Sequence, residues 1–176
     1  MKSAQEWIES LQLEPHPEGG FYRETYRATR LLGGRTPVST AIYFLLRSQD
    51  LSAFHRIASD ELWHLYAVTP QTRLRIWRLN AERGLGTFLL GNEPSRGESF
   101  QEVVSAGDWF AGQLEVLEGG DPSQAYVLAG CTVSPGFQFS DFELAKADEL
   151  CRSWPQHQEL IRPLCRRESA DNAPLR

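Results

Sequence analysis

The feature that most constrains the fold is a series of nine short, strand-like segments with no helical pattern between them. In the first segment, Phe21, Arg23, Thr25 and Arg27 alternate with the intervening side chains, and this period of two is typical of a β-strand. The other segments are rich in aromatic or β-branched residues. The segments are Phe21–Arg27, Thr40–Leu46, Ser52–Ile57, Leu62–Val68, Thr72–Leu79, Gly86–Leu90, Phe100–Val104, Asp108–Val116 and Ala125–Val133.

The residues between these segments favour turns. Gly91-Asn92-Glu93-Pro94 and Gly119-Gly120-Asp121-Pro122 are two examples, in which Gly permits a positive φ and Pro presets φ. Parallel α/β architecture needs a crossover helix between strands, and the sequence has none there. The pattern therefore predicts an all-β sandwich or barrel.

Helical pattern is confined to the two ends of the chain. Ser3 and Glu6 form a capping-box pattern before apolar residues at helical spacing, which predicts a short helix over Ser3–Leu13. Helical pattern returns in Leu144–Trp154 and near Pro155–Arg162. We expect one domain over residues 1–167, and a disordered tail over 168–176 because those residues have little apolar surface to bury.

Composition excludes several classes of function. The net charge is −5 and the pI is about 5.4, so no basic surface is expected to bind nucleic acid. No apolar run approaches the roughly 20 residues of a membrane helix, and no signal segment is evident. An odd count of three cysteines without metal-ligand spacing indicates reduced thiols and a cytoplasmic protein. We expect Cys131 to be a buried, inert thiol.

Three blocks of sequence resemble the Cupin_5 (DUF985) family of the cupin superfamily. The sequence HPEGGFYRET begins at His16, HRIASDELWH begins at His55, and GCTVSPGF begins at Gly130 and is followed by Asp141-Phe142-Glu143. The resemblance implies an RmlC-like jelly roll (a double-stranded β-helix, or cupin barrel) that forms a homodimer. It does not bring an established reaction.

Cupins commonly bind a divalent metal through three His and one Glu, and this chain matches that pattern only in part. His55 and Glu61 fall on two ligand positions, whereas Ile57 and Phe110 fall on the other two. A catalytic metal needs at least three protein ligands, so we expect no metal cofactor. Binding of a divalent metal remains an alternative only if His64 also faces the interior. Strand alternation instead puts His64 on the face opposite to Glu61.

The candidate site follows from these positions. We predict that His55 and Glu61 meet in a hydrated cavity inside the barrel, with His55 as general base, Glu61 orienting it and Tyr43 as the acid. The turn around His16 is interpreted as structural rather than ligand-binding. Candidate ligand-binding residues are His64, Trp63, Trp109, Phe110 and Phe139, because small-molecule pockets are mostly apolar.

Three classes of function remain open at this point. The first is metal-independent epimerase- or isomerase-like chemistry on a polar small molecule, by analogy with deoxysugar-nucleotide epimerases of the same superfamily. The second is a non-catalytic protein that binds a nucleobase- or sugar-like ligand by stacking on aromatic rings. The third is a metal-dependent cupin enzyme, which Ile57 and Phe110 disfavour.

Overall fold

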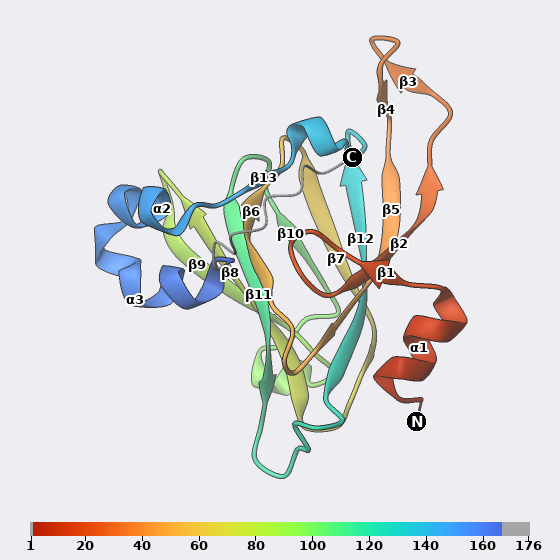
Figure 1. The fold of residues 1–176 in the computed structure, drawn as a ribbon, viewed down its shortest axis with the longest axis vertical. Coiled ribbons are helices and arrows are strands. Elements are labelled where there is room, and N and C mark those ends of the chain that lie inside the picture. The colour runs from red at the N-terminus through yellow and green to blue at the C-terminus, as the bar shows by residue number, and fades with distance from the viewer. Residues whose placement is uncertain (1, 167–176) are drawn as a thin grey trace.

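A computed structural model of the chain describes residues 2–166. In it the chain folds into an antiparallel jelly roll of two facing sheets (Figure 1). The larger sheet has six strands. In spatial order they are β1 (Glu14–Pro15), β2 (Phe21–Arg27), β5 (Thr40–Arg47), β12 (Tyr126–Ser134), β7 (Asp60–Val68) and β10 (Gln101–Val104). The smaller sheet has five. They are β13 (Glu143–Leu144), β6 (Ser52–Arg56), β11 (Trp109–Val116), β8 (Thr72–Asn80) and β9 (Gly84–Leu90).

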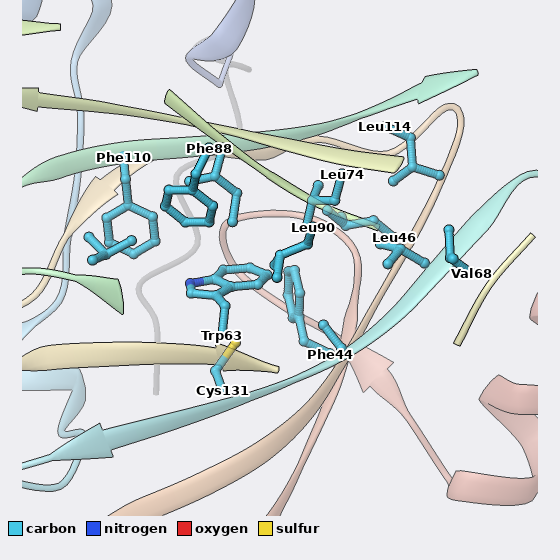
Figure 2. Close-up of a cluster of buried hydrophobic side chains, with 14 of the residues drawn as sticks. Phe44, Leu46, Trp63, Val68, Leu74, Phe88, Leu90, Phe110, Leu114 and Cys131 are labelled. Atoms are coloured by element: carbon cyan, nitrogen blue, oxygen red, sulfur yellow. The ribbon is translucent and has the colours of Figure 1, made fainter. Parts of the chain in front are cut away.

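The main hydrophobic core fills the space between the two sheets. Figure 2 shows Phe44, Trp63 and Cys131 of the six-stranded sheet in one cluster with Phe88 and Phe110 of the other. All five side chains are buried, and Phe44 and Trp63 meet edge to face. Burial of several large apolar side chains, each contributing about 1.5–3 kcal/mol, is the main force that holds the sheets together.

Helices cover the outer faces of both sheets. The helix α1 (Ala4–Leu11) packs over Leu45 and Leu128 of the six-stranded sheet, with Ser3 and Glu6 forming the expected capping box. On the other side, α2 (Ala147–Ser153) and α3 (Gln158–Ile161) cover the five-stranded sheet. Four 3₁₀ turns complete the described elements: η1 (Pro94–Arg96), η2 (Phe139–Asp141), η3 (Pro155–His157) and η4 (Arg162–Leu164).

The fold predicted from the sequence is confirmed as an all-β jelly roll with terminal helices. Each of the nine predicted segments overlaps a strand of the structure. The prediction lacked the two-residue strands β1, β13, β3 (Leu31–Leu32) and β4 (Thr36–Pro37). The last two form a hairpin that projects from the barrel (Figure 1).

Two further predictions concern the C-terminal tail and membrane-spanning helices. The proposed tail over 168–176 lies outside the described residues. Within residues 2–166, none of the helices has the length and apolar character needed to cross a membrane.

Candidate functional site

A cavity of about 270 Å³ opens between the sheets at one end of the barrel. Its polar lining is concentrated in a few buried groups, among them His16, Glu18, His55 and Glu61. Aromatic and aliphatic side chains form most of the remaining wall. The full lining is His16, Glu18, Tyr22, Glu24, Arg27, Thr40, Ile42, Phe44, His55, Ile57, Glu61, Cys131, Val133, Phe137, Phe139 and Phe142.

Glu18 reaches the cavity from a tight turn between β1 and β2. The backbone N–H of His16 donates to the carbonyl of Gly20, and the N–H of Gly19 donates to the carbonyl of His16. The backbone carbonyl of Glu18 accepts a hydrogen bond from the Ala53 N–H on β6, at 3.0 Å. The turn is therefore fixed to the strand that carries His55.

Glu18 and His55 form a buried hydrogen-bonded pair. The His55 Nε2 atom lies 3.0 Å from Glu18 Oε2, and the Ser52 hydroxyl donates to Glu18 Oε1 at 2.7 Å. The other imidazole nitrogen, Nδ1, lies 2.7 Å from the carbonyl oxygen of Ala53. Since a carbonyl only accepts, Nδ1 carries a proton. Both nitrogens of His55 are thus bonded to protein groups.

Burial keeps this pair electrically neutral. It lowers the pKa of His55 to about 4, against a smaller rise from the Ala53 carbonyl. Burial and the nearby Glu61 carboxyl raise the pKa of Glu18 well above its usual value. Separate charges are costly in a low-dielectric interior, so the shared proton resides on Glu18 and is donated to His55 Nε2.

Glu61 is the second buried acid of the cavity. Burial raises the pKa of Glu61 to about 7, and a hydrogen bond from the Cys131 thiol acts in the opposite direction. Glu61 and Cys131 lie on neighbouring strands, where Val133 pairs with Glu61 and Cys131 pairs with Trp63. Near neutral pH this carboxyl exists in both protonation states, which suits a general base.

His16 lies in the same turn as Glu18, and its Nδ1 atom is 3.4 Å from Glu18 Oε2. Its Nδ1 atom accepts a hydrogen bond from the backbone N–H of Glu18 at 3.3 Å. Tyr22 packs on its ring with centroids 4.5 Å apart. Burial lowers the pKa of His16 to about 3, so the imidazole is neutral.

Arg27 is the lining cation of the cavity. Its guanidinium donates two hydrogen bonds to the Glu24 carboxylate, at 2.9 and 2.6 Å, and a third to the carbonyl of Phe137. Phe139, a predicted ligand-binding residue, lies in the wall and is half exposed. The positive charge of Arg27 is therefore balanced by the Glu24 carboxylate, without a ligand.

The residues present do not fit the three-His, one-Glu metal centre of the superfamily. Ile57, which cannot ligate, lines the cavity at one ligand position. Phe110, at another, packs on the His55 ring with centroids 4.0 Å apart. Across residues 2–166, no three His, Cys, Asp or Glu side chains are arranged to hold a metal ion.

Two of the predicted site residues lie on the outer face of the six-stranded sheet. Tyr43 packs beneath α1 and against Tyr66, with ring centroids 5.8 Å apart, because its neighbour Phe44 takes the inward position. The expectation that Tyr43 acts in the cavity is therefore wrong. His64 bonds to the Thr132 hydroxyl and to Gln101, as strand alternation indicated, and it does not line the cavity.

The three remaining predicted ligand-binding residues also lie outside the lining. Trp63 points inward but belongs to the closed core beside Phe44 (Figure 2). Trp109 is on the outer face of its sheet, where the Arg56 guanidinium stacks 4.6 Å from its ring centroid. Phe110 is fully buried behind His55. The prediction that these three contact a ligand in the cavity does not agree with their positions.

Sequence reasoning missed Glu18 and His16, which it assigned to a structural turn. The signal was present in the HPEGG motif, because its two glycines do not require a His or a Glu beside them. His55 and Glu61 do line one cavity, as predicted. However, the carboxylate that meets His55 comes from Glu18 rather than from Glu61.

Comparison with known proteins agrees with this architecture. A crystal structure of a Shewanella oneidensis protein superposes with a TM-score of 0.84 at 38% identity, covering 96% of this chain and 100% of that one. A hypothetical protein from Leishmania major gives a TM-score of 0.84 at 31% identity, covering 94% and 100%. No curated protein matches the sequence. Residues 5–145 match the model of the Cupin_5 family, described as cupin superfamily (DUF985), and the chain belongs to that family.

Proposed function

We propose that the protein is a metal-independent proton-transfer enzyme, of the isomerase or epimerase type, that acts on a polar molecule about the size of one sugar ring. One observation carries the proposal: two buried acid–base units, Glu61 and the Glu18–His55 pair, line the same small cavity. Groups with perturbed pKa values gather at functional sites because catalysis requires such values.

The two units differ in the direction in which each can move a proton. Glu61, whose pKa lies near 7, takes a proton from the carbon next to a substrate carbonyl. The electron pair of that C–H bond forms a C=C bond, and the carbonyl oxygen accepts the proton of Glu18, which leaves its hydrogen bond to His55 Nε2 in this step. Return of a proton to either carbon, with loss of the enol proton to Glu18, completes an isomerisation or epimerisation.

His55 has a different role from the one expected. Because both of its nitrogens are bonded to protein groups, it holds and orients the Glu18 proton instead of contacting the substrate. Ser52 supports the carboxylate that remains after Glu18 donates. The proposed reaction requires neither a metal nor an organic cofactor.

A binding protein without catalysis is the second candidate. Phe44, Phe137, Phe139 and Phe142 border the cavity and offer aromatic surfaces to a flat ligand such as a nucleobase. Binding in a thermal-shift panel of metabolites without any proton exchange or product would favour this function.

Hydrogen–deuterium exchange tests the proposed enzyme. The protein is incubated in D₂O with single-ring and acyclic hydroxy-carbonyl compounds, and proton NMR follows loss of the signal next to each carbonyl. We expect exchange with at least one compound, reduced about 100-fold or more in Glu61→Gln, as for loss of a general base. The exposed Glu118→Gln variant is the control. Exchange unaffected by Glu61→Gln would reject the mechanism.

A further inference from the structure

His16 presents a fixed hydrogen-bond donor to the cavity. Its Nδ1 atom accepts from the backbone N–H of Glu18, so Nδ1 is the nitrogen without a proton. The imidazole is neutral, because burial lowers its pKa to about 3. A neutral imidazole carries one proton, and here that proton must be on Nε2.

The Nε2–H group has no protein acceptor in the described part of the chain. The contacts of the His16 ring nitrogens run through Nδ1, to the backbone N–H and the carboxyl group of Glu18. Within residues 2–166, one side-chain nitrogen or oxygen atom is both fully buried and without a hydrogen-bond partner, and it is Nε1 of Trp63. His16 Nε2 also lacks a partner, so it is not fully buried. Nε2 therefore borders accessible space, and the space that His16 lines is the cavity.

The surroundings of His16 fix the direction of its ring. Tyr22 and Phe142 pack edge-on against it, and Phe139 stacks at 6.5 Å between centroids. With the backbone bond on the other side, these contacts restrict rotation of the imidazole. A donor held in this way loses little conformational entropy when it binds an acceptor.

We propose that His16 Nε2–H binds the carbonyl oxygen of the ligand, so that the cavity selects carbonyl compounds. A neutral N–H donor suits an uncharged oxygen that gains negative charge as a neighbouring C–H bond is broken. The aromatic rings around His16 accommodate the carbon skeleton beside that oxygen. The inference deepens the proposed function, since it names the substrate class that Glu61 and Glu18 would act on.

Binding measurements with a matched pair of probes test the donor. Acetophenone and ethylbenzene have nearly the same shape, and only acetophenone carries a carbonyl oxygen. In calorimetric titrations we expect the wild type to bind acetophenone about fivefold more tightly, the contribution of one neutral hydrogen bond. The preference should be lost in His16→Phe and kept in His16→Gln, which retains an N–H donor.

The infrared stretch of the bound carbonyl provides a readout that a purely structural role would not change. It should move to lower frequency in the wild type and in His16→Gln, but not in His16→Phe. Nitrogen-15 NMR should also show His16 as the neutral Nε2–H form, without titration between about pH 5 and pH 8. The His16→Gln variant assigns its signal among the four histidines.

The outcomes separate this inference from the proposed function. Equal or undetectable binding of both probes by the wild type, an unshifted carbonyl stretch, or an Nδ1–H form of His16 would each overturn it. These readouts need no turnover. A shifted carbonyl in a protein that exchanges no protons would instead reject the proposed enzyme and leave His16 as a binding residue.

Discussion

At the scale of single residues, burial raises the pKa of Glu61, and a hydrogen bond from the Cys131 thiol opposes part of that rise. The Cys131→Ala variant removes that donor, so the pKa of Glu61 should rise above about 7. Because Glu61 acts as a base only when deprotonated, the limb of the pH–rate profile on which the rate increases with pH should move to higher pH. Cys131→Ser keeps a donor and should stay near the wild type. Deuterium exchange measured across pH checks both variants, and identical profiles would contradict the role of Cys131.

Single residues of the site were predictable where strand alternation was applied strictly. On β7 alternation separates Glu61 from His64, and the structure has them on opposite faces. The same rule places Tyr43 and Phe44 on opposite faces, so the prediction of Tyr43 as the acid did not follow strand alternation. Glu18 lies in a turn, where no period indicates direction, and only the tertiary contact with β6 places it.

At the level of elements, the turn before β2 depends on glycine. Gly19 has a φ of 117°, and a Cβ atom there would lie 1.9 Å from the carbonyl oxygen of Leu51. We expect Gly19→Ala to destabilise the fold by about 2 kcal/mol or more, through backbone strain and this clash. Urea unfolding measures the change.

A matched control separates the local geometry from a general effect of the substitution. Gly86→Ala adds the same methyl group on β9, where the nearest atom is 3.6 Å away. It should change the free energy of unfolding by less than about 1 kcal/mol. Equal effects of Gly19→Ala and Gly86→Ala would contradict the role assigned to the turn.

The longer strands were recognisable because each carries several alternating residues. The two-residue strands β1 and β13 carry no period at all, and they form because neighbouring strands offer free backbone groups at the sheet edges. β13 pairs with β6, where Leu144 lies opposite His55. Such pairing is a property of the assembled sheet, so a local pattern could not indicate it.

For the whole molecule, the buried carboxyl of Glu61 links stability to pH. The pKa of Glu61 is about 7 in the folded state against a usual value of 4.5, so folding binds a proton between these values. This contribution is complete below about pH 4.5 and is lost as pH rises through about 7. Relative to Glu61→Gln, the wild type should therefore lose roughly 3 kcal/mol across that range.

Urea unfolding of both proteins at several pH values measures this difference. His16 and His55 have lowered pKa values and oppose the trend within each protein. Glu18, whose pKa is raised by burial and by Glu61, adds to the trend in the wild type. The exposed Glu118→Gln variant should follow the wild type at every pH. A constant difference between the wild type and Glu61→Gln would show that Glu61 titrates normally.

We also predict a homodimer from the projecting β3–β4 hairpin. Leu31 and Leu32 are 47% and 45% exposed there, and a two-stranded hairpin without packing is marginal in water. A second copy of the chain is the partner that the family resemblance implies. Light scattering at micromolar concentration should give twice the chain mass, and a monomer after joint Leu31→Asp and Leu32→Asp substitution. A monomeric wild type would reject the dimer.

The attachment of the turn to β6 has a consequence for how such a protein can change. His16 and Glu18 come from a short connection ahead of the long strands, and backbone hydrogen bonds hold its main chain in place. Replacing the two side chains would alter the reacting groups while the facing sheets stay as they are. Specificity in this scaffold can thus diverge through a five-residue loop without rebuilding the interior.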